Sequence, residues 1–293
     1  MATIIETVNL TRYYGRQLGI KDLNLVVSEG EIFGYIGPNG AGKSTTIRLL
    51  LGLIRISSGS ARVFGRDVEK HREDILAHIG YMQAESNFYS DMRVGELIGY
   101  SASLRKKDCT AEAAALMDRF ELDPGRKIGE LSLGNRRKVN IVCAMQHRPE
   151  LYILDEPTSG LDPLMQKEFW DLIRERNREG ATFLISSHVL SEVQHNCGRA
   201  AIIRNGSIVR TDDVAKLTGS MAKKVVAAGV PAGFFLEGMR NVKVNGDVLT
   251  FLFRGDINAL LAELAGMDIR DLQITEPDLE EIFLHYYERD ERP

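Results

Sequence analysis

Apolar residues along the chain follow two patterns in alternation. Short, mostly apolar runs are typical of strands buried on both faces of a sheet, and they occur at 31–36, 151–154 and 182–186. Between such runs, apolar residues return at the spacing of an amphipathic helix, as in the set Ile47, Leu50, Leu51 and Ile54. Strands alternating with helices predict an α/β fold with a mostly parallel sheet covered on both faces.

Two regions of the chain depart from this alternation of strands and helices, one near the N-terminus and one that follows it. Residues 4–10 and 23–27 are β-type runs on either side of a Tyr-Tyr-Gly turn. From about 94 to 148 the periodicity is helical throughout, which predicts an all-helical insertion at about 92–148. Further on, the Asn205-Gly206 dipeptide lies between two apolar runs and predicts a two-residue hairpin.

The composition changes near Leu217, and a Thr-Gly-Ser segment at 218–220 marks a predicted domain boundary. Beyond this boundary the pattern predicts a hairpin at 242–253, a helix at 257–264, a strand at 269–275 and a final helix at 279–287. We therefore expect a main domain at 1–217 and a small α+β accessory domain at 218–293.

The composition of the 293 residues is ordinary for a globular protein, with 44% hydrophobic residues, 27% charged residues and a net charge of −4. A net negative charge gives no general attraction for polyanions, so we expect no nucleic acid partner. The three cysteines are widely spaced and form no disulfide or metal pattern, which is typical of a reducing cytosol. Because no segment approaches about eighteen consecutive apolar residues, we expect that the chain does not span a membrane by itself.

The strongest chemical signal is the stretch 37–45, which has the P-loop pattern Gly-x-x-x-x-Gly-Lys-Ser between a predicted strand and a predicted helix. Without Cβ atoms, the glycines let backbone N–H groups converge on a phosphate at the positive end of the helix dipole. We predict that Lys43 reaches the β- and γ-phosphates of a nucleotide and that Ser44 binds Mg²⁺. The predicted nucleotide-binding residues of the loop are Gly37, Pro38, Asn39, Gly40, Ala41, Gly42, Lys43, Ser44 and Thr45.

Asp155 and Glu156 close a strand of four hydrophobic residues, which is the Walker B pattern. At the C-terminal end of a strand, Asp155 can hold Mg²⁺ through water, opposite Ser44. Glu156 would then lie beside the γ-phosphate and orient or deprotonate the attacking water. Alone, this pair could cap the next helix, but its pairing with a P-loop favours the catalytic interpretation.

Gln83 and His188 also follow predicted strands. An isolated glutamine is more often a surface or core polar group than a metal ligand, and an isolated histidine is more often a satisfied side chain. Neither residue therefore predicts a function when it is considered alone.

Taken together, the motifs resemble those of an ABC transporter ATP-binding subunit. The matching segments, in the family's order and spacing, are 37–45, Gln83, 131–135, 154–158, 159–162 and His188. The resemblance covers residues 1 to about 217, and six motifs in register make it specific. The stretch 276–284 is similar to the C-terminal extension of the family's drug-, antibiotic- and lipid-exporter subfamily.

The resemblance implies an ABC-type P-loop NTPase with an N-terminal antiparallel β subdomain, a RecA-like core, a helical insertion and a small α+β C-terminal appendage. It implies ATP and Mg²⁺ as cofactors and ATP hydrolysis as the reaction. It assigns catalysis to Lys43, Gln83, Glu156 and His188, and metal binding to Ser44, Gln83 and Asp155. In these roles Gln83 contacts Mg²⁺ and the attacking water, and His188 hydrogen-bonds the γ-phosphate and positions the water.

The resemblance also implies that Tyr14 stacks on adenine, with Tyr13 as the competing choice. Ser132 and Gly134 would contact the γ-phosphate of ATP bound to a second copy of the chain, and Asp162 would lie across the dimer interface. The implied partners are a second copy, in an ATP-sandwich homodimer, and a separate integral membrane permease.

The signature segment departs from the usual Leu-Ser-Gly-Gly-Gln of the family. Leu133 replaces its first glycine and Asn135 replaces its glutamine. Leucine does not adopt positive φ at low cost, so we expect a less strained or displaced backbone here and a competent but slower site.

Three functions are compatible with these motifs. The first is the ATPase subunit of an exporter, cytoplasmic and peripheral on the inner face of the cell membrane through its permease. The second is a soluble ABC ATPase acting on ribosomes or DNA, which the single P-loop and the net acidity count against. The third is a scaffold without turnover, which the intact Lys43, Asp155, Glu156 and His188 count against. We therefore predict an ATP-hydrolysing subunit that powers export through a separate permease.

Overall fold

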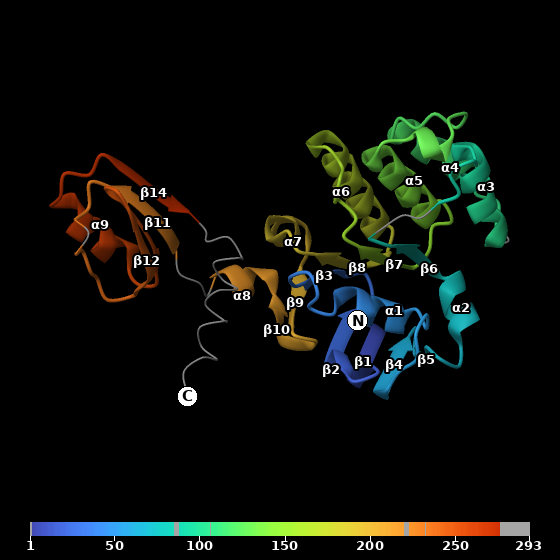
Figure 1. Ribbon diagram of the computed structural model, residues 1–293, viewed down its shortest axis with the longest axis horizontal. Helices are drawn as coiled ribbons and strands as arrows, with labels where there is room; N and C mark the ends of the chain where they lie inside the picture. Colours follow the sequence, from blue (N-terminus) through green and yellow to red (C-terminus); the bar gives the residue numbers. More distant parts are fainter. Residues whose placement is uncertain (1, 85–87, 106, 220–222, 232, 276–293) are drawn as a thin grey trace. The chain divides into compact units, whose positions relative to one another are not determined.

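The computed structural model describes residues 2–84, 88–105, 107–219, 223–231 and 233–275 of the chain. They form two compact units, the first ending at Asp213 and the second beginning at Val214 (Figure 1). The boundary expected after Leu217 falls inside the short helix α8 (Val214–Gly219). Among the described residues, the first unit contains two sheets and the second contains one, and each unit has its own hydrophobic core.

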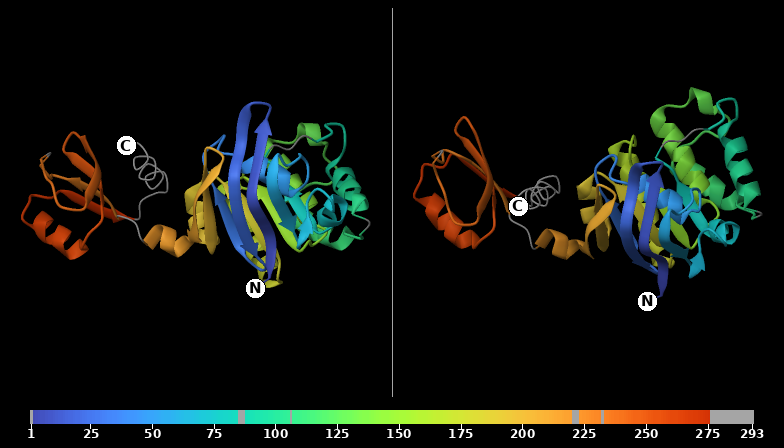
Figure 2. Two further views of the ribbon diagram at one scale, coloured as in Figure 1. Left: turned by 90° about the horizontal axis from the view of Figure 1, so that it is seen from below. Right: turned by 60° about the horizontal axis from the view of Figure 1, so that its bottom comes forward.

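The first unit starts with an antiparallel sheet in the order β2-β1-β4-β5. Its strands are β1 (Thr3–Tyr14), β2 (Gln17–Ser28), β4 (Ser58–Val63) and β5 (Arg66–Asp67). The long β1–β2 hairpin is drawn in blue in Figure 2. Side chains such as Ile5, Leu10 and Leu25 alternate with exposed residues and are buried on one face of the sheet.

A second sheet in the order β10-β9-β3-β8-β7-β6 forms the centre of the first unit. Its strands are β3 (Ile32–Ile36), β6 (Ile79–Met82), β7 (Leu151–Asp155), β8 (Thr182–Ser187), β9 (Arg199–Arg204) and β10 (Ser207–Asp213). All neighbours are parallel except β9 and β10, which form the hairpin predicted at Asn205-Gly206. The predicted mostly parallel sheet is therefore confirmed.

Both faces of the central sheet are buried, because alternate residues of one strand enter different hydrophobic clusters. In β8, Phe183 and Ile185 belong to the cluster shared with α5 and α6, whereas Leu184 belongs to the cluster shared with α1 and the antiparallel sheet. The helices around the sheet include α1 (Lys43–Leu50), α2 (Arg72–Ala77), α6 (Pro163–Arg178) and α7 (Leu190–Asn196). This double burial explains why the strands are apolar along their whole length.

The segment predicted to be helical throughout from 94 to 148 contains α3 (Val94–Leu104), α4 (Thr110–Arg119), the 3₁₀ turn η1 (Ile128–Glu130) and α5 (Leu133–Met145). The prediction is wrong at 107–109, before α4, and again between Phe120 and Ser132, where Glu121 has a positive φ and Pro124-Gly125 cannot continue a helix. Phe120 and Leu122 are nevertheless buried in the core, which explains why the apolar pattern continued.

The described part of the second unit is a four-stranded antiparallel sheet in the order β12-β13-β11-β14 with one helix. Its elements are β11 (Lys223–Ala228), β12 (Met239–Asn245), β13 (Val248–Phe253), α9 (Ile257–Ala265) and β14 (Asp271–Thr275). The predicted hairpin at 242–253 is confirmed, and the predicted helix at 279–287 lies outside the described residues. Across the described residues, no helix has the length and apolarity needed to cross a bilayer.

Candidate nucleotide-binding site

The P-loop connects β3 to α1 by a turn that glycine makes possible. Gly40 and Gly42 have φ of 79° and 111°, and a Cβ on Gly42 would lie 2.7 Å from a methyl group of Ile20. Gly42 is the N-cap of α1 and supplies no side-chain cap. The first N–H groups of this helix are therefore available to an anion from outside the helix.

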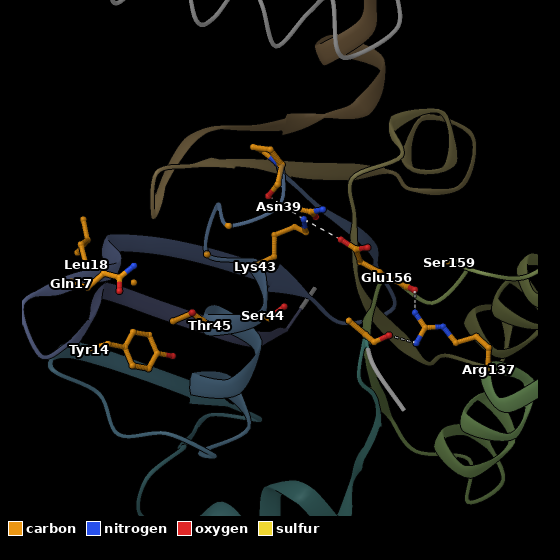
Figure 3. A pocket seen from close by; sticks show the side chains of 15 residues that line it. Tyr14, Gln17, Leu18, Asn39, Lys43, Ser44, Thr45, Arg137, Glu156 and Ser159 are labelled. Carbon is orange, nitrogen blue, oxygen red and sulfur yellow. Dashed lines mark hydrogen bonds and ion pairs between the residues drawn. The ribbon is translucent and has the colours of Figure 1, made fainter. Parts of the chain in front are cut away.

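Lys43 is fixed at the start of α1 with its ammonium group inside the loop. Its Nζ donates to the carbonyl oxygen of Gly37 at 2.6 Å and lies 3.2 Å from Oε1 of Glu156. Only 6% of the lysine side chain is exposed. The arrangement holds one positive charge between the P-loop backbone and the end of β7 (Figure 3).

Three side chains that carry oxygen atoms lie in contact at this point, those of Ser44, Asp155 and Ser186. Ser44 Oγ donates to Asp155 Oδ2 at 2.7 Å, and Ser186 Oγ donates to Asp155 Oδ1. The contact follows from the topology, because Asp155 and Ser186 are register partners at the carboxyl ends of the parallel strands β7 and β8. A carboxylate beside a hydroxyl supplies the hard oxygen donors that suit Mg²⁺.

The described residues place one carboxylate and one hydroxyl at this point, those of Asp155 and Ser44, and no closed cage of protein ligands. Within the part of the chain that the structure describes, no three His, Cys, Asp or Glu residues cluster as metal ligands. Ser44 and Asp155 therefore fit a Mg²⁺ ion that keeps water and phosphate oxygens in most of its coordination positions.

The two carboxylate oxygens of Glu156 contact two different side chains, those of Lys43 and His188. Oε1 faces Lys43, and Oε2 lies 2.9 Å from Nδ1 of His188. The Glu156 side chain is only 17% exposed, whereas that of His188 is 46% exposed and reaches solvent. The predicted residues Lys43, Glu156 and His188 are thus brought into one connected chain of contacts.

The backbone of Glu156 is in the left-handed region, with φ of 49°. Four hydrogen bonds hold it there: its N–H donates to the carbonyl and the hydroxyl of Ser186, and its carbonyl accepts from Arg137 and from the N–H of Ser159. A strained residue held by its surroundings is common at functional sites.

Arg137 and Ser186 are site residues that the sequence did not reveal. Arg137, on α5, donates to the carbonyls of Gln83, Ala84 and Glu156, and so ties α5 to the ends of β6 and β7. Burial lowers the pKa of Arg137, while the charges of Asp155 and Glu156 act in the opposite direction. The available signals were a paired arginine at the start of α5 and a polar end to the apolar strand β8.

A cavity of about 550 Å³ connects these groups to the β1–β2 hairpin (Figure 3). Its lining includes Tyr14, Gly19, Lys43, Arg137 and Glu156, with the other P-loop residues Pro38, Asn39, Gly40, Gly42, Ser44 and Thr45. Tyr14 lies at one end and Glu156 at the other, which leaves room for an extended ligand between an aromatic ring and the phosphate-binding loop. Tyr13 is not one of the described residues that line the cavity.

Eight predicted site residues are not among the described residues that line this cavity. Gly37 and Ala41 belong to the P-loop, and Asp155 and His188 contact the lining residues Ser44 and Glu156. The other four are Gln83, Ser132, Gly134 and Asp162. The carbonyl of Gln83 accepts from Arg137 and Asn140, and its side chain does not line the cavity. Ser132 caps α5 by accepting from the N–H of Asn135, and Asp162 caps α6 by accepting from Met165. Ser132 and Asp162 are exposed and Gly134 is half-buried. Their predicted roles depend on a second copy and stay predictions.

Leu133 is the first residue of α5, and its side chain is 74% exposed. Its φ is not positive, so the leucine that stands in place of the family's first signature glycine causes no backbone strain here. Its side chain packs beside Gly160, in the loop that follows Glu156.

A parallel sheet whose strand ends carry a P-loop lysine, a serine–aspartate pair and a strained glutamate defines a P-loop nucleotide-binding protein. The family model described as ABC transporter matches residues 20–159. The bacitracin transport ATP-binding protein BcrA of Bacillus licheniformis is 33% identical over 299 residues, which cover 97% of each chain. The chain belongs to the ATP-binding proteins of ABC transporters, and it is an ATPase subunit of that class.

Solved structures confirm the predicted ABC-type fold. The structure of an ATP-binding subunit of an ABC transporter has a TM-score of 0.69 and 30% identity, and the match covers 74% of this chain and 92% of that one. The ATP-binding cassette MJ0796, solved as a dimer in a post-hydrolysis state with ADP and Pi, has a TM-score of 0.65 at 20% identity and covers 72% of this chain and 99% of its own. The second likeness concerns the fold alone.

Proposed function

We propose that ATP with Mg²⁺ binds in the cavity between Tyr14 and the P-loop, and that this chain hydrolyses the γ-phosphate to drive export through a separate membrane permease. The observation that carries the proposal is the connected set Lys43, Glu156 and His188 beside the Ser44–Asp155 pair. When bound, Mg²⁺ would neutralise charge on the phosphates, with Ser44 and Asp155 as its protein ligands.

The chain's own residues then have distinct tasks. Lys43 binds the β- and γ-phosphate oxygens, because its ammonium is already fixed by the carbonyl of Gly37. Glu156 orients the attacking water and accepts its proton, since its carboxylate is mostly shielded from solvent. His188, which contacts Glu156 and is half exposed, donates to the γ-phosphate. Gln83 is proposed to sense the metal and the water from the end of β6.

The site is completed by a second copy of the chain. Ser132 lies at the N-terminus of the 13-residue helix α5 with its side chain exposed, so both the helix end and its hydroxyl can reach an anion on another molecule. Gly134 and Asp162 would contribute to the same interface. The cassette MJ0796, which shares this fold, has itself been solved as a dimer with ADP and Pi.

The permease would hold the chain on the cytoplasmic face of the membrane. BcrA is a bacitracin transport protein, which supports a small-molecule or peptide cargo here, while the resemblance of 276–284 to the exporter extension lies outside the described residues. In this assembly the helical segment α3–α5 and the end of β6 would pass the nucleotide state to the permease.

The variant Glu156→Gln tests the proposal by removing the proton acceptor and keeping the shape of the side chain. With ATP and Mg²⁺ it should form a stable dimer on size-exclusion chromatography with light scattering, and hydrolysis should fall about a hundredfold or more. Glu73→Gln on the exposed face of α2 is the matched control and should behave like the wild type. A Glu156→Gln variant that stays monomeric and hydrolyses ATP normally would overturn the assignment.

The permease is tested by purifying the chain from native membranes and identifying the integral protein that copurifies in the presence of ATP. A membrane protein present in stoichiometric amount supports transport. Sedimentation of the chain with ribosomes from the soluble fraction, without a membrane protein, would overturn the transport proposal.

A further inference from the structure

The ring of Tyr14 has one of its faces covered by another side chain. The guanidinium carbon of Arg12 lies 4.9 Å from the centre of the Tyr14 ring, which is the geometry of a cation–π contact. Both residues belong to β1, at the end of the strand that leads into the hairpin turn. A base that stacks on Tyr14 therefore has only the opposite face of the ring available.

Arg12 is itself anchored to a second part of the unit. Its Nη1 donates to the carbonyl of Arg55 at 2.9 Å, in the loop that follows the P-loop helix α1. A second hydrogen bond joins the β1–β2 hairpin to this loop, because the N–H of Tyr13 donates to Oγ of Ser57. Arg12 thus links the aromatic end of the cavity to the segment that continues from the phosphate-binding end.

The edge of the Tyr14 ring is also closely fitted. A Cβ on Gly19 would lie 2.9 Å from Cε2 of Tyr14 and 3.3 Å from a methyl group of Thr45, so the ring occupies space that a side chain on β2 would fill. Gly19, Tyr14 and Thr45 all line the cavity. Arg12 on one face and Gly19 at the edge therefore define a single position for the ring.

We propose that Arg12 is a positioning residue for nucleobase binding: its guanidinium holds the Tyr14 ring in place so that the opposite face is presented to the base of the nucleotide. The inference rests on the proposed stacking of adenine on Tyr14. Arg12 acts through Tyr14 and is not one of the described residues that line the cavity, so its effect requires a base on the ligand.

The test compares two ligands that differ in the base, ATP and inorganic tripolyphosphate, each with Mg²⁺, by isothermal titration calorimetry on the full-length chain. Arg12→Ala should weaken ATP binding about threefold and leave tripolyphosphate binding unchanged. Arg12→Lys keeps a cation near the ring and should lose less than Arg12→Ala. Arg62→Ala, an exposed arginine of the same sheet, is the control and should change neither ligand.

A double-mutant cycle separates positioning from a general structural effect. In a Tyr14→Ala background, Arg12→Ala should cause no further loss of ATP affinity, because there is no ring to hold. Equal losses for ATP and tripolyphosphate, the same loss with and without Tyr14, or no loss of ATP affinity in Arg12→Ala would each overturn the inference. If Tyr14→Ala itself weakened both ligands equally, the stacking role of Tyr14 would fail, and the inference with it.

Thermal unfolding of each variant accompanies the titrations. If Arg12→Ala does not fold, Arg12→Lys carries the same comparison, and a loss restricted to ATP is still required.

Discussion

At the scale of single residues, the site depends on side chains that hold other side chains. Asp155 accepts from both Ser44 and Ser186, and Ser186 also accepts from the N–H of Glu156. One serine therefore orients both the carboxylate that is proposed to bind Mg²⁺ and the backbone of the proposed catalytic glutamate. Its hydroxyl is buried, so water cannot replace it easily.

Ser186→Ala should lower the free energy of unfolding by about 1–2 kcal/mol, because it removes hydrogen bonds to two buried groups. ATP turnover should fall at least about tenfold, because Asp155 loses one of the two hydroxyl donors that orient it. Urea unfolding and steady-state phosphate release measure the two effects. The exposed Ser191→Ala on α7 is the control, and normal turnover in Ser186→Ala would show that Asp155 needs no such support.

The P-loop and Asp155-Glu156 could be predicted from the sequence because their signals are local: a motif of fixed spacing and an acidic pair directly after an apolar run. Arg137 and Ser186 could not, because their partners lie far away in the chain. Arg137 reaches Gln83 over 54 positions, and Ser186 reaches Asp155 over 31. Such contacts are set by the order of strands in the sheet, which periodicity does not encode.

At the scale of elements, α5 joins the helical segment to the ends of β6 and β7 through Arg137 and Asn140. The apolar periodicity predicted a helix in this region, but it did not predict the residue at which α5 begins. The helix begins at Leu133, capped by Ser132, whereas the apolar pattern ran unbroken from 94. Ser132 thus has a capping role within this chain as well as its proposed role toward a second copy.

Leu133→Gly should increase ATP turnover about threefold, because it removes an exposed apolar side chain from the end of α5 that faces the proposed partner. Stability should change little, since the position is exposed and at the first turn of the helix. Steady-state hydrolysis at several chain concentrations measures the effect. A lower or equal rate would show that Leu133 does not limit the site.

His147, just after α5, makes stability depend on pH. Burial, with Arg105 and Lys107 nearby, lowers its pKa from 6.5 to about 4, and its Nε2 lies 3.2 Å from the carbonyl of Ile79. Because the folded state binds the proton less readily than the unfolded state, its contribution is complete above pH 6.5 and is lost as the pH falls toward 4.

The expected loss of unfolding free energy from His147 is about 3 kcal/mol between pH 6.5 and pH 4. Urea titrations at several pH values measure it, and His147→Gln should flatten this part of the profile. The exposed His195→Gln on α7 should not. An unchanged profile in His147→Gln would assign the acid sensitivity to other groups.

At the scale of the molecule, the chain consists of two units whose described hydrophobic clusters are each complete within one unit. The α/β alternation predicted the central sheet, and the shift in composition predicted a second unit. The division was expected after Leu217, and the first unit ends at Asp213. Composition changes gradually across a short helix such as α8, so it does not locate a boundary to the residue.

A fragment of residues 1–219 should therefore fold by itself and bind ATP with a dissociation constant within about twofold of the full chain, because every residue of the cavity lies in the first unit. Circular dichroism melting and calorimetric titration measure this. A fragment that aggregates or loses ATP affinity would show that the first unit depends on the second.

The left-handed backbone at Glu156 has a consequence for how this position can change over time. The conformation is one that glycine adopts at little cost and that other residues disfavour by roughly 1 kcal/mol. Replacement by glycine would relieve this backbone strain but would remove the carboxylate that is proposed to accept the proton of the attacking water. Selection for fold stability therefore favours glycine at position 156, whereas selection for ATP turnover favours glutamate. If transport were no longer under selection, we expect substitutions to glycine to accumulate at this position.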